Sequence, residues 1–361
     1  MNEKNLIKSR QICFLYLALT PVTKLSLYPS VLAGYAGEAL WLSALCGFAL
    51  ELTVIAAALL FIKKHPDKTL YSVIEESTNA AAAKCVFFLY SVFFFLKATL
   101  PLIEQKTYIE NTLYEIMPSS FVFFPFFVVS LFACLKGMKV FGRIADIAVF
   151  VTGAGIITAI LLTAPVADYS NLLPLFKKPA YNVINGTFRS IVWHSDGVYM
   201  LMFAGHFKWE KGSGKRIILS YAGASLAALV FVATFYSIYG AIAKSQTFAL
   251  PAATVFSISA ANVGRFDFLS IFLLLFSQIF AVVFPLFAAV KCLERVFGLK
   301  TAAAPAVVVN ALMVVYAIVF GKKLFLVLNL NANVLSFLFL AVTIVPTAIL
   351  LLLPRRKNES V

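Results

Sequence analysis

A short polar stretch interrupts one of the long apolar segments of this chain. Residues 191–200 read IVWHSDGVYM, so a histidine, a serine, an aspartate and a glycine lie within a run of hydrophobic residues. The core of a bilayer holds no water to solvate such groups, and they must face protein, a cavity or a ligand. The stretch therefore predicts a binding site inside a membrane protein.

Two properties of this stretch suit ligand binding. Gly197 weakens a helix, and Ser195 and Asp196 compete for backbone hydrogen bonds, so unwinding would free amide and carbonyl groups. The N-terminus of a following half-helix would favour an anionic group. The alternative is a continuous helix whose His194 and Asp196 bond to neighbouring helices. The predicted ligand-binding residues here are Trp193, His194, Ser195, Asp196 and Gly197.

The first apolar segment carries a matching interruption at residues 20–24, of sequence TPVTK. Pro21 removes a backbone donor and disfavours helix at the residue before it. Broken helices in corresponding halves of a membrane protein are the best sequence pointer to a midplane site. The predicted ligand-binding residues of this segment are Thr20, Thr23, Lys24 and Ser26.

Lys24 lies near the middle of the bilayer if the segment is helical, because each residue advances about 1.5 Å. An isolated charge there is unfavourable, so we expect Lys24 to pair or to lose its proton. Its candidate partners are Asp196, Glu51 and the carboxylate of an amino-acid ligand. The alternative is a snorkelling lysine whose ammonium reaches water.

The composition indicates the class of protein. The chain has 361 residues, of which 61% are hydrophobic and 13% charged, whereas soluble domains are about 45–50% apolar and about 25% charged. We predict an all-α polytopic membrane protein with ten transmembrane helices of about 20 residues. The predicted spans are 11–35, 39–62, 82–105, 119–135, 145–164, 187–207, 216–243, 267–290, 303–320 and 333–353.

Basic residues sort by side of the membrane. Most of the 30 lysines and arginines flank the predicted spans on the side of the N-terminus. The positive-inside rule then places both termini in the cytoplasm. The net charge of +14 thus orients the chain and requires no nucleic-acid partner.

No motif for catalysis or metal binding is found in the sequence. The five cysteines lie within or at the ends of apolar segments, without metal-ligand or CxxC spacing, and we expect small buried hydrophobes. No nucleophile with a base and an orienting group is recognisable. We therefore expect no enzyme activity, no metal and no cofactor.

Ten spans divide into two sets of five, residues 11–164 and 187–353, joined by an extracytoplasmic connection at 165–186. An odd number of spans per half requires that structural repeats insert in opposite orientations. We therefore expect one membrane domain built as a 5+5 inverted repeat with broken helices 1 and 6. Glu104, Lys106 and Glu110 mark the outer end of helix 3, where the last two suit an exposed i, i+4 pair.

Several short motifs occur in the order found in one family. In this sequence they are LSLYP at 25–29, WLS at 41–43, HPDKTLY at 65–71, Lys106 with Glu110, NLLP at 171–174, RFD at 265–267 and FGLK at 297–300. The chain thus resembles the GerAB-like spore germination permeases, the B subunits of spore germinant receptors. These belong to the amino acid–polyamine–cation transporter superfamily, with its leucine-transporter-type fold.

The resemblance implies a function. Such a subunit would bind a germinant, an amino acid or similar small solute, between helices 1, 3, 6 and 8. It would pass the signal to an A-type membrane subunit and a C-type lipoprotein in the spore inner membrane. Possible partner or gating contacts are Glu104, Lys106, Glu110, Arg265 and Asp267.

The chain departs from the family pattern at both interruptions. Val22-Thr23-Lys24 stands where the family commonly has a G-x-G-like stretch, and Ser195-Asp196-Gly197 where helix 6 tends to carry a Gly-Glu pair. Two alternatives therefore stay open beside the receptor subunit. One is an active amino-acid or amine transporter, and the other is a structural subunit with a degenerate pocket.

Overall fold

The computed structural model describes residues 6–65, 68–112, 119–175, 177–207, 209–255 and 267–352, and within them the chain is helical. An isolated β-bridge joins Ile7 to Phe207. The α-helices are α1 (Ser9–Val22), α2 (Leu27–Ala36), α3 (Leu40–Lys64), α4 (Leu70–Ser77), α5 (Ala80–Thr112), α6 (Ser119–Lys136), α7 (Met138–Thr163), α8 (Tyr181–Arg189), α9 (Tyr199–Met202), α10 (Ser213–Tyr239), α11 (Ala249–Val255), α13 (Asp267–Phe297), α14 (Ala303–Phe320), α15 (Leu324–Leu330) and α16 (Ser336–Leu352).

Among the described residues, seven helical segments are long and apolar enough to cross a membrane. They are Leu27–Lys64, Ala80–Glu110, Met138–Val166, Ser213–Ser245, Leu274–Phe297, Ala303–Phe320 and Leu324–Pro346. The first of these changes direction at Gly37, whose φ of 62° lies outside helical geometry. The chain is thus a multi-pass membrane protein, which confirms the predicted class.

Three helices run well beyond the apolar windows seen in the sequence. Helix α5 continues to Thr112, α7 begins at Met138 and α13 continues to Phe297. Hydropathy reports only the apolar part of such a helix, whereas its backbone hydrogen bonds continue into the polar region. Lys106 and Glu110, which follow the predicted span 82–105, therefore belong to α5.

The first interruption separates α1 from α2. Helix α1 ends at Val22, one residue after Pro21, and α2 begins at Leu27. The carbonyl oxygens of Leu25 and Ser26 accept hydrogen bonds from the amides of Leu250 and Ala249, at 3.0 Å each. The first turn of α11 thus satisfies backbone groups that the break leaves free.

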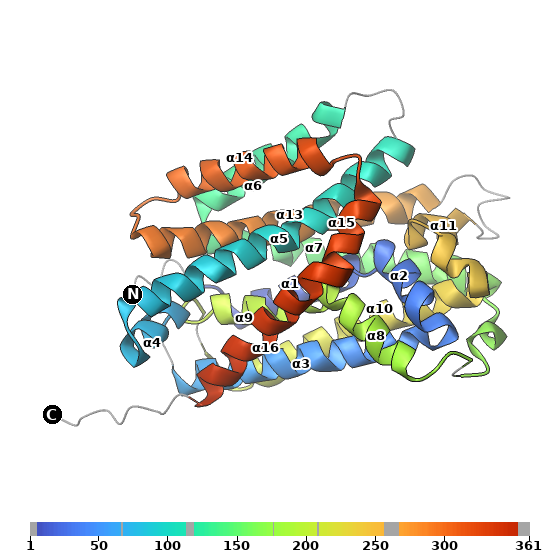
Figure 1. The fold of residues 1–361 in the computed structure, drawn as a ribbon, viewed down its shortest axis with the longest axis horizontal. Coiled ribbons are helices and arrows are strands. Elements are labelled where there is room, and N and C mark those ends of the chain that lie inside the picture. Colours follow the sequence, from blue (N-terminus) through green and yellow to red (C-terminus); the bar gives the residue numbers. More distant parts are fainter. Residues whose placement is uncertain are drawn as a thin grey trace.

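The second interruption spans the residues between α8 and α9. After Arg189 the chain forms two short 3₁₀ turns, η5 (Ile191–His194) and η6 (Asp196–Val198), before α9 begins. Figure 1 shows α1 and α9 in the middle of the molecule, with α5 and α13 on one side and α3 and α10 on the other. Both interruptions therefore lie inside the bundle.

Helix α3 approaches the second interruption at Gly47. A Cβ atom on Gly47 would lie 2.4 Å from ring atoms of His194, so only glycine allows this approach. The ring of His194 also lies edge-on to Phe48 and Tyr28, with centroids 5.0 and 5.3 Å away. The position of His194 thus depends on the missing side chain of Gly47.

We expect Gly47→Ala to destabilise the protein by about 1–3 kcal/mol, because the added methyl group must displace a closely packed ring. Thermal unfolding of the purified protein in detergent measures the effect. Gly153→Ala in α7 is the matched control, because its Cβ would meet no atom within 4 Å. The control should keep or slightly raise stability, and equal melting temperatures for both variants would contradict the prediction.

Candidate ligand site at the helix interruptions

Four buried charged side chains meet where the two interruptions face each other. Lys24 follows α1, Glu51 lies in α3, Lys97 in α5, and Asp196 begins η6. The side chains of Lys24 and Glu51 are fully buried, and that of Lys97, the most exposed of the four, is 7% exposed. Two ammonium and two carboxylate groups thus share one water-poor region.

Asp196 links the two lysines. Its Oδ2 lies 3.2 Å from Nζ of Lys24, and its Oδ1 lies 2.8 Å from Nζ of Lys97. The carbonyl of Asp196 accepts a hydrogen bond of 3.4 Å from the hydroxyl of Tyr16. One carboxylate therefore holds the first interruption, α5 and the second interruption together.

Glu51 is the second carboxylate. Its Oε2 lies 3.8 Å from Nζ of Lys24 and accepts a hydrogen bond of 2.7 Å from the hydroxyl of Tyr221. Its Oε1 accepts a hydrogen bond of 3.0 Å from the amide of Gly197. Glu51 thus satisfies a backbone donor of the second interruption while it balances charge.

The ammonium of Lys97 lies in a cradle of oxygen atoms. Besides its pair with Asp196, it donates to Oγ of Ser195 at 2.7 Å and to the carbonyl of Val192 at 3.2 Å. Ser195 in turn donates to the same carbonyl at 2.9 Å. Three acceptors around one nitrogen form a binding place for a primary ammonium group.

Lys24 is held by the end of its own helix. Its ammonium donates to the carbonyl of Thr20 at 3.2 Å and to Oγ1 of Thr23 at 3.4 Å. Thr23 also donates to the same carbonyl at 3.2 Å. The end of α1, whose carbonyls carry partial negative charge, therefore adds to the attraction from the carboxylates.

His194 completes the buried polar cluster. Its Nε2 lies 2.8 Å from the hydroxyl of Tyr28, and its Nδ1 lies 3.8 Å from Oε2 of Glu51. The histidine thus connects α2 to the carboxylate of α3. Trp193, its neighbour, packs edge-on against Tyr28 with ring centroids 5.6 Å apart.

Little room remains beside these groups. A cavity of about 20 Å³ is lined by residues that include Thr23, Lys97, Trp193, Asp196 and Tyr199. This volume suits about one water molecule, whereas ligand pockets measure about 300–1,000 Å³. The described conformation is therefore closed around its own ion pairs.

A second cavity of about 20 Å³ lies at the start of α2, between Ser26, Glu104 and their neighbours. Oε1 of Glu104 accepts a hydrogen bond of 2.9 Å from the amide of Leu27, the first residue of that helix. A carboxylate at a helix N-terminus is stabilised by the free amides and by the helix dipole. Ser26 is thus separated from the lysine cluster and contacts a different part of α5.

The predicted site residues therefore divide into groups. Thr20, Thr23, Lys24 and residues 193–197 come together, whereas Ser26 joins Glu104. Lys106 pairs with Glu110 and donates to the carbonyl of Gly321 at 3.0 Å. The expected exposure of this pair is wrong for Lys106, which is buried because α14 ends against α5.

The remaining two predicted contacts, Arg265 and Asp267, lie at or next to a segment that the structure does not describe. Arg265 lies outside the described residues, and Asp267 is described only as the first residue of α13.

Lys97 and Glu51 are the principal site residues absent from the predicted ligand-binding set, although Glu51 was predicted as a candidate partner of Lys24. Both carried a usable signal, since each is a charged residue in the interior of an apolar span, as Lys24 is. Tyr16 and Tyr221 gave no such signal, because a tyrosine is common in membrane helices. Their roles follow only from contacts between distant helices.

Comparison with known proteins shows the class to which the fold belongs, that of membrane permeases and transporters. Residues 7–326 match the family model described as Spore germination protein. The chain belongs to this spore germination permease family, as the resemblance predicted. None of the curated proteins matches it in sequence.

Solved transporters share the fold. A manganese transporter of Eremococcus coleocola bound to an aromatic bis-isothiourea compound superposes with a TM-score of 0.62 at 15% identity, over 95% of this chain and 78% of that one. MHP1, a nucleobase-cation-symport-1 family transporter in a closed conformation with bromovinylhydantoin, gives a TM-score of 0.51 at 15% identity, over 95% and 80%. At such identities the likeness concerns the fold alone.

The carboxylates of the site already have cationic partners. Among the described residues, no group of three or more histidine, cysteine, aspartate or glutamate side chains is arranged to hold a metal ion. Glu51 and Asp196 instead contact lysine ammonium groups. Each carboxylate of the site is thus paired with an ammonium group of the chain itself.

We expect Lys24→Met to lower the free energy of unfolding by about 3–5 kcal/mol, because it leaves two buried carboxylates with one cation. Adding Glu51→Gln should recover part of this loss, since Asp196 keeps Lys97 as its partner. Unfolding in mixed detergent micelles measures both variants.

The control for Lys24 is Lys68→Met, which breaks a largely exposed pair with Glu76. Exposed pairs contribute little, so this variant should unfold almost as the parent does. A Lys24→Met protein as stable as the control would show that the buried cluster does not need its charge balance.

Proposed function

We propose that the chain is a B-type subunit of a spore germinant receptor, which binds a small solute at the two interruptions and signals to partner subunits. Membership of the spore germination permease family supports this proposal. The observation that carries it is the buried cluster of Lys24, Glu51, Lys97 and Asp196. Such a cluster at two adjacent breaks is suited to a charged solute.

The proposed membrane topology has ten spans, arranged as two inverted repeats at 11–164 and 187–353 with both termini cytoplasmic. The seven long segments leave α1, the short apolar part of α6 and the α8–α9 region to complete the count. An interruption near the start of each half supports the repeat. The A-type and C-type partners and the spore inner membrane belong to this proposal through the family resemblance.

We propose that the ligand is a zwitterion, such as an amino acid. Two side chains of α5 already hold an ammonium group and a carboxylate group at the interruptions, and a zwitterion carries both. Lys97 places an ammonium on the carbonyl of Val192, and Glu104 places a carboxylate on the amide of Leu27. A free amino acid carries the same two groups. Its ammonium can take the place of the Lys97 ammonium beside Asp196 while its carboxylate pairs with the displaced Lys97, so that no buried charge is left unpaired.

This exchange provides a signal. Displacement of Lys97 would release α5 from the second interruption and open the cavity that is now about 20 Å³. A ligand shifts a conformational equilibrium only through different contacts in the two states, and this exchange supplies them. Helix α5 packs along α13 for much of its length, so its movement would reach the surface of the bundle.

A built-in cation favours sensing without an ion gradient. The ammonium of Lys24 lies between the two carboxylates and the end of α1, where a coupling cation would otherwise be attracted. We therefore propose that binding needs no sodium. The transporter alternative rests on the fold, and the degenerate-pocket alternative rests on the small cavity.

Amino acids should stabilise the purified protein to the same extent in sodium and in choline buffers. At 100 times the dissociation constant the stabilisation is about 2.7 kcal/mol. A thermal-shift panel of amino acids and small amines measures this, and uptake into proteoliposomes is measured in parallel. We expect binding without accumulation. Gradient-driven accumulation would establish the transporter instead, and a panel without any binder would favour the structural subunit.

Lys97→Ala should lower the melting temperature, and n-propylammonium should restore part of it. This cation supplies the three carbons and the ammonium that the substitution removes. Its ammonium can donate to the same three oxygen atoms, those of Val192, Ser195 and Asp196. n-Propanol is the control for shape without charge, and Lys97→Met, whose side chain fills the space, is the control variant. Equal rescue by propanol, or rescue of Lys97→Met, would contradict an ammonium site.

A further inference from the structure

A large basic cavity lies at the end of the bundle where Ile7 pairs with Phe207. Its volume is about 640 Å³, and α4, α5, α9, α13 and the turn between α6 and α7 contribute to its wall. The positively charged residues that line it are Lys84, Lys136, Lys139, Lys291, Arg295 and Lys300. This volume is within the range of pockets that hold small molecules.

The charge of this cavity is unbalanced. Glu294 is the single carboxylate among its described lining residues, and it pairs with Lys291 at 2.7 Å. Lys84, Lys136, Arg295 and Lys300 come from α5, α6, α13 and the segment after α13, and they face a shared concave space. Their mutual repulsion would be relieved by an anion between them.

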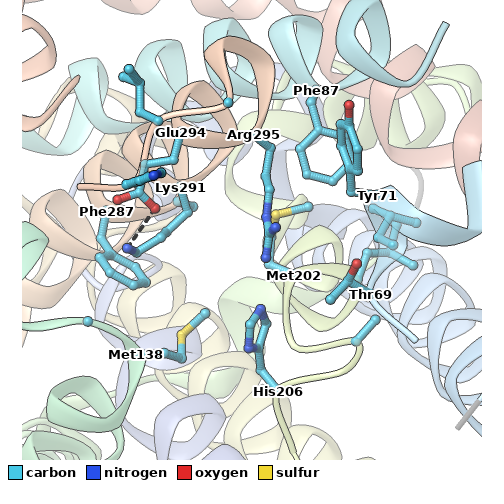
Figure 2. A pocket seen from close by; sticks show the side chains of 18 of the residues that line it. Thr69, Tyr71, Phe87, Met138, Met202, His206, Phe287, Lys291, Glu294 and Arg295 are labelled. Carbon is cyan, nitrogen blue, oxygen red and sulfur yellow. Dashed lines mark hydrogen bonds and ion pairs between the residues drawn. The ribbon is translucent and has the colours of Figure 1, made fainter. Parts of the chain in front are cut away.

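His206 lines the cavity close to the positive charges of Arg295 and Lys291. Figure 2 shows the guanidinium of Arg295 reaching from α13 toward Met202 and His206. Arg295 thus projects a group with five donors across the opening.

Apolar side chains form the rest of the wall. Tyr71 and Phe87 pack edge-on with ring centroids 5.1 Å apart, and Phe287 lies opposite them beside Met138 (Figure 2). Aromatic and methionine side chains bind flat or flexible apolar groups. The cavity therefore combines several cations with a surface for an uncharged body.

We propose that this cavity binds a phosphate-bearing ligand with an apolar body. Phosphate suits the site because it accepts hydrogen bonds from arginine and lysine together and neutralises more than one cation. The positive-inside rule accounts for basic residues in loops at this end. It does not account for their convergence with aromatic rings around one cavity of about 640 Å³.

This ligand site is separate from the proposed solute site and would act on the same helices. Residues of α5, α9 and α13 line the cavity, while α5 also carries Lys97, and α9 follows directly after η6. A bound phosphate would tie these helices together at one end. It would then favour the closed arrangement around the ion pairs.

Calorimetric titration of the detergent-purified full chain with ADP, pyrophosphate and adenosine tests the proposal. We expect ADP to bind, pyrophosphate to bind more weakly because it lacks the apolar body, and adenosine not to bind. Arg295→Gln and, independently, Lys84→Gln should weaken ADP binding at least tenfold. Both residues are exposed, so these variants should fold.

The matched control is Lys215→Gln, which removes an exposed lysine that does not line the cavity. It should change ADP affinity less than twofold, and an equal loss in the control would overturn the proposal in favour of diffuse charge. Absence of ADP and pyrophosphate binding at millimolar concentration, with no effect of anionic lipid, would also overturn it.

Nanodiscs distinguish the two sources of phosphate. If phosphatidylglycerol, compared with phosphatidylcholine alone, raises the melting temperature of the parent but not of Arg295→Gln, the phosphate comes from a lipid headgroup. If ADP binds equally in both nanodiscs, the phosphate belongs to a soluble molecule.

Discussion

The structure depends on charge balance among side chains that are buried inside the bundle. Two lysines and two carboxylates hold together α1, α3, α5 and the 3₁₀ turns of the second interruption. Any one of these charges alone would be strongly unfavourable there, whereas the set is neutral and its members also bond to free backbone groups. The two breaks are therefore stabilised by the same groups that give the site its chemistry.

The breaks themselves have a local origin, and the sequence was informative about them. Pro21 lies in the last turn of α1, and Ser195, Asp196 and Gly197 lie in the stretch of 3₁₀ turns. Proline and glycine act through the backbone of their own segment, so their effect is readable from a few residues. The membrane class follows in the same way from composition and from long apolar windows.

The pairing of the charges depends on the whole fold. Lys24 and Asp196 are 172 residues apart in sequence, and Lys97 and Ser195 are 98 apart. The sequence offered Glu51 and Asp196 as alternative partners for Lys24, and both contact it. Lys97 was not included among the predicted site residues because nothing near it in sequence indicates which helix it faces. Burial of Lys106 likewise depends on where α14 ends.

Glu104, whose carboxylate lies at the start of α2, shows how one helix, α5, can contact both interruptions. Lys97 and Glu104 lie two turns apart on α5, and each satisfies a backbone group at a different break. A single helix thus contacts both breaks. Side chains of the protein itself occupy both positions.

Neutrality of the buried cluster also has an electrical consequence. Moving one charge across a membrane potential of 100 mV involves about 2.3 kcal/mol. A zwitterion that takes the place of Lys97 beside Asp196 and pairs with the displaced ammonium carries no net charge, and the pair of Lys24 and Glu51 stays inside the protein. Occupancy of such a site would be independent of membrane voltage, so the ligand would bind equally well in a cell whose membrane is not energised.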